Sequence, residues 1–146
     1  MNGKPSLKSI LAAAEKLVAG AGTCVLSTLA ADGYPATRAL LAPRFRKGLL
    51  HMEFTTNTSS RHVSEVRADS RGSIYFYDPT LFQGLLLQGT LTVSTEQVDR
   101  DRIWQKGDEM YYSGGRSDPD YAVMLFSASR GRWYANFMKT DFMLQE

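Results

Sequence analysis

The pattern of hydrophobic and polar positions predicts a helix at the start of the chain, followed by a series of short strands. Between Ser6, a candidate N-cap, and the terminating glycines Gly20 and Gly22, the apolar residues fall on one helical stripe. The later apolar runs are short and are separated by turn residues, which is typical of strands. We expect strands at residues 23–29, 34–41, 49–55, 73–77, 85–95, 121–128 and 131–137, with a further short one at 142–144.

Two more helices and several turns complete this pattern. The helices are expected at residues 59–68 and 98–111, although Gly107 weakens the second half of the latter. Turns are predicted at 31–33 and 46–48, a loop at 114–119, and a bend at Gly89 within a long strand. Six or seven strands joined by tight turns favour antiparallel pairing in a barrel. We therefore predict an α+β barrel with a few peripheral helices, forming a single domain over residues 1–146.

Composition narrows the class of protein without naming a function. Hydrophobic residues make up 43% of the 146 residues and charged residues 22%, which is ordinary for a globular protein. A formal net charge of +2 gives no reason to expect a nucleic-acid partner. The apolar runs are strand-sized, so no membrane partner is expected, and no signal peptide is recognised at the start. A single cysteine, Cys24, excludes an intrachain disulfide, and we expect a cytoplasmic protein.

The segment that carries most chemistry is residues 54–62, where a strand ends in hydroxyl side chains and a helix then begins with serines and an arginine. Free N–H groups and the helix dipole attract anions to a helix N-terminus. Ser60 can donate an O–H, and Arg61 offers a forked pair of donors to phosphate oxygens. These features predict a phosphate or carboxylate site. The alternative interpretation is a Ser-capped surface helix that carries a solvated arginine.

Arg38 is the second candidate, because it interrupts an otherwise apolar strand. A buried arginine is costly unless it meets an anion. Strand alternation places Arg38 on the same face as Ala36 and Leu40, which favours an inward or interface position. An outward position at a sheet edge remains open on this evidence.

The order of these features resembles a known family over nearly the whole chain. The N-terminal helix is followed by the strand 24–29, an Asp-Gly-Tyr-Pro turn at 32–35, Arg38, the run 55–62 (Thr-Thr-Asn-Thr-Ser-Ser-Arg-His) and the glycine strand around Gly89. The sequence resembles the pyridoxamine 5′-phosphate oxidase-like, FMN-binding split β-barrel superfamily, especially its general stress protein 26-like branch. The segments 91–104 and 114–121 are also similar to that branch. The resemblance implies a six- to seven-stranded antiparallel split β-barrel.

The resemblance also implies a homodimer with FMN at the subunit interface. The positions that match cofactor contacts of the family are Arg38, Thr55, Thr56, Ser60, Arg61, His62, Gln88 and Trp133. Arg38 matches a strand arginine near the flavin or its phosphate, Thr55 and Thr56 match positions that meet the flavin, and Ser60 and Arg61 match phosphate ligands. His62 stands where the family usually has lysine, and this departure removes a permanent cation.

Two of these positions rest on weaker grounds. Gln88 lies on a strand that commonly borders the flavin from the partner subunit. Trp133 matches a tryptophan that lies near the flavin in some relatives, while packing in the core is the alternative interpretation.

Other reactive side chains receive structural interpretations. Cys24 lies between apolar strand residues and is expected to be buried. His51 stands apart from any cysteine or carboxylate at metal-ligand spacing, and a turn accounts for Asp118 and Asp120 better than calcium binding does. No metal site is predicted, and no residue is identified as a general acid or base.

The resemblance thus implies an FMN-dependent oxidoreductase that accepts electrons from a reduced nicotinamide donor or a small organic substrate. Pyridoxamine-phosphate oxidase activity itself is not expected, because residues 131–141 lack the Arg-x-His arrangement of those oxidases. Three alternatives stay open. They are a non-catalytic flavin-binding stress or sensor protein, a haem-binding relative with His51 or His62 as axial ligand, and a structural dimer without a cofactor.

Overall fold

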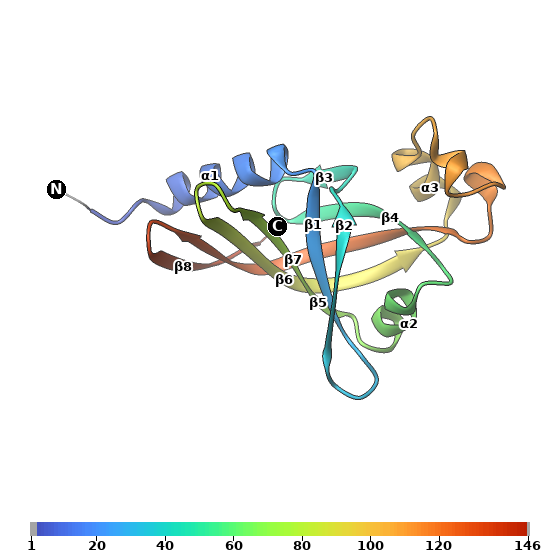
Figure 1. Ribbon diagram of the computed structural model, residues 1–146, viewed down its shortest axis with the longest axis horizontal. Coiled ribbons are helices and arrows are strands. Elements are labelled where there is room, and N and C mark those ends of the chain that lie inside the picture. The colour runs from blue at the N-terminus through green and yellow to red at the C-terminus, as the bar shows by residue number, and fades with distance from the viewer. Residues whose placement is uncertain (1–2, 146) are drawn as a thin grey trace.

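The chain folds around one antiparallel sheet, which contains eight strands within residues 3–145, the part that this computed structural model describes (Figure 1). Along the sheet the order is β2-β1-β5-β6-β7-β4-β3, and β8 pairs with β7. The strands are β1 (Thr23–Leu29), β2 (Pro35–Leu41), β3 (Phe45–Lys47), β4 (His51–Asn57), β5 (Arg71–Asp78), β6 (Gln83–Ser94), β7 (Tyr121–Ala135) and β8 (Met138–Met143). The predicted α+β class and antiparallel pairing are confirmed.

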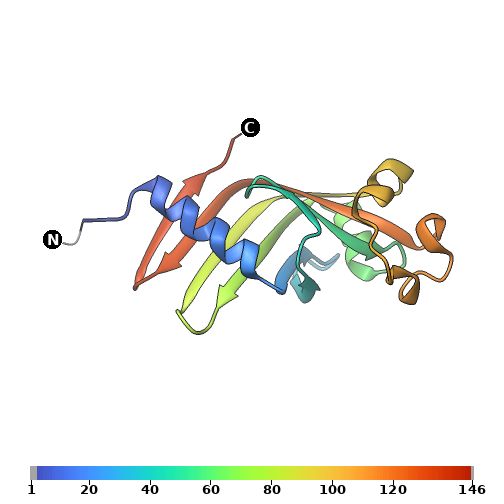
Figure 2. The same cartoon turned by 90° about the horizontal axis from the view of Figure 1, so that it is seen from above.

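Helix α1 (Leu7–Gly20) lies across the sheet and closes the main core (Figure 2). Ser6 is its N-cap, as predicted, and the Ser6 hydroxyl accepts a hydrogen bond from the Ser9 N–H at 3.1 Å. Three residues of its apolar stripe, Ile10, Ala14 and Val18, are buried against the sheet. These contacts supply the hydrophobic burial that stabilises the helix on the barrel.

The first hairpin shows how local sequence sets strand register. Gly33 has a φ of 87°, and the Tyr34 N–H donates to Asp32 Oδ1 at 3.0 Å. The turn pairs β1 with β2 from Leu29 opposite Pro35 to Thr23 opposite Leu41. This register places Arg38 opposite Leu26, in the middle of the hairpin.

Strand β7 organises the rest of the sheet. One of its edges pairs with β6, and its other edge pairs first with β4 and then with β8. The pairing with β6 shifts register between Gln88 and Gly89, where a β-bulge bends the strand. The bend predicted at Gly89 is therefore confirmed.

Helix α2 (Arg61–Ala68) follows β4 after a short loop and lies beside the β1–β2 hairpin (Figure 1). Helix α3 (Gln97–Ile103) and two short 3₁₀ turns, η1 (Asp108–Met110) and η2 (Gly115–Ser117), form the other end of the molecule. Ile103 packs there with Tyr112, Tyr121 and Val123 in a second, smaller hydrophobic cluster.

Four predicted boundaries were wrong. Residues 45–47 form β3 rather than a turn, and residues 121–135 form one strand rather than two. Helix α3 ends at Ile103, because Trp104 is extended and Gly107 has a φ of 101°, outside the helical region. Strand β8 begins at Met138, after a tight turn in which Asn136 and Phe137 both have positive φ.

None of the helices within residues 3–145 is long and apolar enough to cross a membrane.

The close packing at the Gly89 bulge predicts that a single methyl group added at position 89 strongly lowers the stability of the fold. A Cβ added to Gly89 would lie 1.9 Å from the Ser127 carbonyl oxygen, so the backbone of β6 or β7 would have to move. We expect Gly89→Ala to lower the free energy of unfolding by about 2–3 kcal/mol in urea denaturation. Gly22→Ala is the matched control, because its Cβ meets no atom within 4 Å. Equal midpoints for the two variants would contradict this account of the bulge.

Candidate functional site

The three segments predicted to bind an anion converge at one corner of the sheet. Strand β2 carries Arg38, the end of β4 carries Thr56, and α2 begins at Arg61. His62 Nε2 lies 2.7 Å from Thr56 Oγ1, and Arg38 Nη2 lies 3.1 Å from Glu65 Oε1. These two contacts join β4 to α2 and β2 to α2, so the three elements form one site.

Asp120 holds the loop that leads into α2. Its carboxylate accepts hydrogen bonds from the Asn57 amide at 2.8 Å, the Thr58 hydroxyl at 2.9 Å and the Ser59 N–H at 2.9 Å. The hydrogen bonds from Asn57 and Ser59 are the main causes that lower the pKa of Asp120 to about 2. The carboxylate is therefore ionised at neutral pH, and it fixes the angle at which α2 starts.

The N-terminus of α2 presents several donors. Ser60 is the N-cap, yet its side chain makes no capping hydrogen bond. Arg61 is exposed, and within residues 3–145 no carboxylate is ion-paired with its guanidinium. The free hydroxyl, the free guanidinium and the first N–H groups of the helix all favour an anion at this point.

Arg38 points inward and already has an anionic partner. Its guanidinium donates to Thr28 Oγ1 at 2.8 Å and to Glu65 Oε1 at 3.1 Å, while Thr28 also donates to Glu65. The side chain of Glu65 is only 7% exposed and that of Arg38 24%. The outward alternative for Arg38 is therefore wrong, and much of its charge is balanced within the chain.

His62 is partly buried between the two charges of this pair. Burial lowers its pKa, the nearby Arg38 guanidinium lowers it further, and Glu65 acts in the opposite direction. With a pKa below its usual 6.5, the imidazole is neutral at and above neutral pH. Among the residues that the structure describes, Arg61 is therefore the one permanent cation that faces outward at the start of α2.

A cavity of about 220 Å³ lies beside this corner. Its walls are the last residues of β2 from Ala39 to Leu41, the β4 residues Phe54 and Thr55, and the tyrosines Tyr111 and Tyr112. Tyr112 is buried and donates from its hydroxyl to the Thr56 carbonyl oxygen at 3.1 Å, which anchors the end of β4. The cavity thus combines an apolar wall with strand backbone, and Asn57 at its rim leads into the loop before α2.

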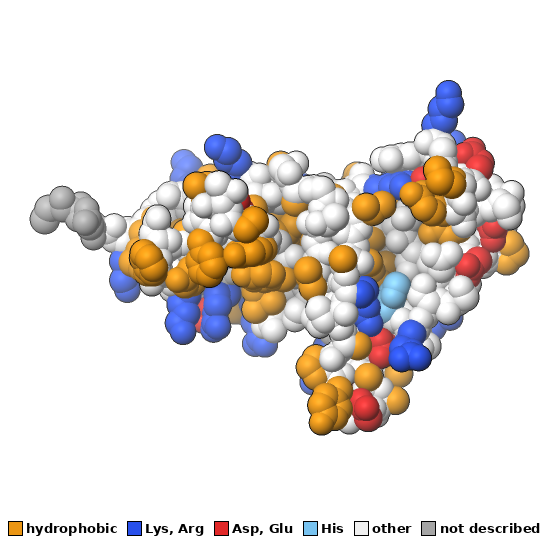
Figure 3. Space-filling view, in the orientation of Figure 1, with side chains coloured by type: hydrophobic (Ala, Val, Ile, Leu, Met, Phe, Trp, Pro, Cys, Tyr) orange, Lys and Arg blue, Asp and Glu red, His pale blue; other side chains and the backbone are white. Residues whose placement is uncertain are grey.

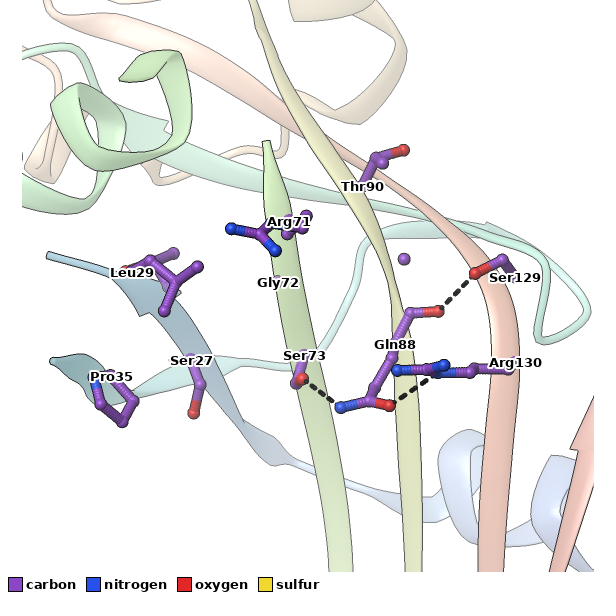
Figure 4. A pocket seen from close by; sticks show the side chains of 12 residues that line it. Ser27, Leu29, Pro35, Arg71, Gly72, Ser73, Gln88, Thr90, Ser129 and Arg130 are labelled. Atoms are coloured by element: carbon purple, nitrogen blue, oxygen red, sulfur yellow. Dashed lines mark hydrogen bonds between the residues drawn. The ribbon is translucent and has the colours of Figure 1, made fainter. Parts of the chain in front are cut away.

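Gln88 lies on a different face of the sheet, in a larger cavity of about 430 Å³ (Figure 4). Its side chain donates to Ser73 Oγ at 3.3 Å and accepts from Arg130 Nε at 2.9 Å. Figure 4 shows these three side chains in a row across β5, β6 and β7. Within one protomer, Gln88 therefore does not join the α2 site.

Trp133 does not lie at the α2 site of the same protomer either, and the structure agrees with the alternative interpretation, packing in the core. It is 5% exposed and belongs to the main hydrophobic cluster under α1. Val123 is the β7 residue that pairs with Thr55, and Trp133 lies ten residues further along the same strand. At the rise of a strand, ten residues separate Val123 from Trp133 by about 33 Å.

Sequence reasoning missed Glu65, Asp120 and Tyr112. Each acts on a partner at least 27 positions away, namely Arg38, the loop 57–59 and Thr56. A carboxylate on a short helix or in an Asp-Pro-Asp turn gives no local signal of such a partner. The nearest sequence signal was Arg38 itself. Burying an unpaired guanidinium costs free energy, so an anionic partner could be expected, but its identity could not be predicted.

The remaining reactive side chains are engaged elsewhere. Cys24 is buried, and burial raises the pKa of its thiol to about 12, so it is an inert core residue. His51 Nε2 lies 2.6 Å from Glu53 Oε2, and Glu53 also accepts from Arg102. Within residues 3–145, His, Cys, Asp and Glu side chains form no cluster of three that could hold a metal ion.

Comparison with solved structures identifies close matches to this fold. A protein from Clostridium acetobutylicum related to general stress protein 26 of Bacillus subtilis is 30% identical, covers 92% of this chain and 94% of its own, and superposes with a TM-score of 0.84. An FMN-binding, pyridoxamine 5′-phosphate oxidase-related protein from Nostoc punctiforme is 16% identical, with 99% of both chains covered and a TM-score of 0.68. A heme-binding protein from Mycobacterium smegmatis is 17% identical and has a TM-score of 0.72, covering 97% of this chain and 60% of its own.

Comparison with curated proteins finds no match. The family model described as pyridoxamine 5′-phosphate oxidase matches residues 10–134, which is most of the chain. This match covers β1 to β6, all of β7 but its last residue, and every residue of the α2 site. The chain therefore belongs to the pyridoxamine 5′-phosphate oxidase-like superfamily, in the branch related to general stress protein 26.

Proposed function

We propose that the chain is a cytoplasmic, homodimeric flavoprotein that binds FMN and transfers electrons or hydride between a reduced donor, such as a nicotinamide nucleotide, and a small-molecule substrate. The observation that carries this proposal is Arg61 at the start of α2, four residues after Asn57, which lines the same cavity as Thr55. A phosphate at the helix and a planar ring in the cavity match the two ends of FMN. The FMN-binding protein from Nostoc punctiforme shares the fold, which supports the choice of cofactor.

The donor set fits a phosphate dianion. Ser60 and Arg61 supply a free hydroxyl and a free guanidinium, and the helix amides add neutral donors. Arg38 contributes less than its charge implies, because Glu65 is bound to it. Thr55 and the backbone of residues 39–42 would then meet the ring system, which agrees with an apolar wall that carries a few polar groups.

The size of the cavity supports a dimer. Sites for ligands of drug size span about 300–1,000 Å³, while the cavity beside α2 measures about 220 Å³. One protomer therefore offers only part of the enclosure that FMN needs. A second protomer placed over the cavity would complete it and exclude water from the ring.

FMN, when bound, supplies the electron or hydride transfer, and the chain's own residues bind and orient it. Asp120 positions the loop before α2, and α2 in turn positions Arg61 and His62. Tyr112 anchors the end of β4, and Thr55 of that strand lines the cavity. These residues are positioning groups, and none of them is placed to exchange a proton with a substrate.

A haem-binding function is the second candidate, supported by the fold shared with the heme-binding protein from Mycobacterium smegmatis. Both histidines argue against it, because each has its Nε2 engaged. His51 contacts Glu53, and His62 contacts Thr56. A histidine that bound haem iron through Nε2 would have to leave its partner.

The absorption spectrum of the freshly purified protein tests the cofactor, with mass analysis of whatever heating releases. We expect the two flavin bands and FMN. Anaerobic NADH should bleach these bands within seconds to minutes, faster than it bleaches free FMN at equal concentration. Flavin bands that NADH does not bleach would indicate a flavin-binding protein without this activity. A Soret band would indicate haem as the cofactor in place of flavin. A colourless protein that fails to take up FMN would refute the proposal.

Arg61→Ala should weaken FMN binding because it removes the charge-assisted phosphate contact. We expect a loss of about 1.5–3 kcal/mol, or roughly 10- to 100-fold in Kd. Fluorescence titration of the apoprotein with FMN measures it. Arg67→Ala is the matched control, since Arg67 is an exposed arginine in the last turn of the same helix. If both variants bind FMN equally, Arg61 is not a phosphate ligand.

His62→Lys should strengthen FMN binding at pH 8. The lowered pKa of His62 keeps the imidazole neutral there, so the substitution adds a permanent cation beside the helix N-terminus. We expect a gain of about fivefold to tenfold in affinity. His62→Gln should match the wild type at pH 8, because it replaces one neutral group by another. A large loss of affinity in His62→Gln would show that the imidazole acts in a way that charge does not explain.

A further inference from the structure

Two hairpin turns and the start of α1 meet at the end of the molecule opposite α3 (Figure 1). Gly84 near the start of β6 pairs with Tyr134 near the end of β7, which brings the β5–β6 turn beside the β7–β8 turn. A cavity of about 220 Å³ between them is lined by Pro5 just before α1, by Gln83 and by Asn136 of the β7–β8 turn. Figure 2 shows the two turns side by side at this end.

This end of the molecule exposes large apolar side chains from all three segments. Phe137 in the β7–β8 turn is 95% exposed, and Phe82 in the β5–β6 turn is 59% exposed. The exposed set, which we call the apolar tip, is Leu7, Leu81, Phe82, Phe137 and Met138. In Figure 3 hydrophobic side chains gather at this end, with Lys and Arg side chains on either side of them. Scattered exposed apolar residues are ordinary, but such a group indicates contact with another surface.

Both phenylalanines of the apolar tip have backbone conformations that bulky residues rarely adopt. Phe82 has a φ of 51° and Phe137 a φ of 61°, a region that costs a bulky side chain free energy. Phe82 meets the Tyr77 and Tyr134 rings edge-on at 5.8 Å, and its ring still stays mostly exposed. Exposed rings gain little from their own fold, so a second surface that takes up both rings would offset this cost.

The charges around the apolar tip are mainly those of three exposed lysines. Lys4 and Lys8 lie at the start of α1, whose first turn contains no acidic residue although the helix dipole favours anions there. Lys139 follows the β7–β8 turn, and within residues 3–145 no carboxylate is ion-paired with any of the three. The carboxylate of Asp78 is engaged by two N–H groups of the β5–β6 turn. An anionic surface therefore complements this end of the molecule.

An anionic lipid surface fits this combination better than a protein partner does. Protein interfaces are depleted in lysine and take most of their binding energy from tryptophan, tyrosine and arginine. The apolar tip instead combines phenylalanine, leucine and methionine with lysines, which is typical of segments that enter the headgroup region of anionic bilayers. Projecting turns also suit a deformable lipid surface, because they need no complementary pocket.

We propose that the apolar tip docks the protein on a membrane surface rich in anionic lipids, with both hairpin turns in the headgroup region and the three lysines against lipid phosphates. Docking leaves the α2 site open, because Thr55 pairs with Val123 near the start of β7 and the apolar tip lies beyond the end of that strand. The apolar runs of the sequence are too short to span a bilayer, and docking needs no such run, because three separate segments supply the tip. The inference is independent of the proposed flavin chemistry.

Flotation of the full-length protein with lipid vesicles tests the docking. We expect binding to vesicles of equal parts phosphatidylcholine and phosphatidylglycerol, weaker at high salt, and little binding to phosphatidylcholine alone. Phe82→Ser combined with Phe137→Ser should lower the vesicle partition coefficient about tenfold or more. Val98→Ser combined with Met110→Ser is the matched control, since these exposed apolar residues lie at the α3 end of the molecule.

Two further variants test the charge and the insertion separately. Reversing all three lysines, with Lys4→Glu, Lys8→Glu and Lys139→Glu, should abolish the preference for phosphatidylglycerol, because each lysine near an anionic surface contributes about fivefold. Phe137→Trp keeps an aromatic ring in the turn, and its emission should shift to the blue with anionic vesicles. This variant repeats the test if the double serine variant does not fold, as judged by circular dichroism.

Four results would overturn the inference. They are a wild type that does not float with anionic vesicles, equal partition of the two double serine variants, a lysine reversal that leaves binding unchanged, and a Phe137→Trp emission that vesicles do not shift. Sedimentation velocity adds a check without lipid. If the Phe82 and Phe137 substitutions dissociate a wild-type dimer, the tip packs on a second copy and the lipid assignment is wrong. Flavin uptake is measured apart from all these results, so the proposed function would stand.

Discussion

The pairing of β7 with three other strands is the constraint on which the site depends. Its first residue, Tyr121, follows Asp120 directly, so the strand that pairs with β4 also delivers the carboxylate that holds the loop before α2. At the bulge, β7 and β6 approach so closely that only glycine fits at position 89. The backbone that closes the sheet therefore also sets where α2 begins and in which direction its free N–H groups point.

Much of the fold was predictable because its signals are local. The helix α1, the β1–β2 hairpin, the start of α2 and the bend at Gly89 each follow from a cap, a turn residue or an apolar period. The failures have a common cause. Strand β3 has only three residues, and β7 runs through the polar pair Ser129–Arg130, which looks like a turn until its partner strand is known.

The residues of the site also divide into those with a local sequence signal and those without one. A strand end and a helix start carry such signals, and the residues predicted from them lie together in the structure: Arg38, Thr56, Ser60, Arg61 and His62. Glu65 and Asp120 were not predicted, since their partners are brought to them only by the tertiary fold. Trp133 is a different case. The family pattern relates it to the flavin, and within one protomer the structure packs its ring in the main core, as the alternative interpretation has it.

The charge arrangement at α2 has a consequence for binding. Arg38 and Glu65 nearly cancel, and burial keeps His62 neutral, so among residues 3–145 Arg61 is left as the exposed permanent cation at the helix start. One cation and a few amides are a weak anchor for a dianion in water, where screening reduces a surface contact to a modest gain. In the proposed dimer a second surface would exclude water from this anchor and strengthen it, since electrostatic attraction grows as the local dielectric falls. If the proposed FMN site lies at a subunit interface, cofactor binding and subunit association are thermodynamically linked, and each favours the other.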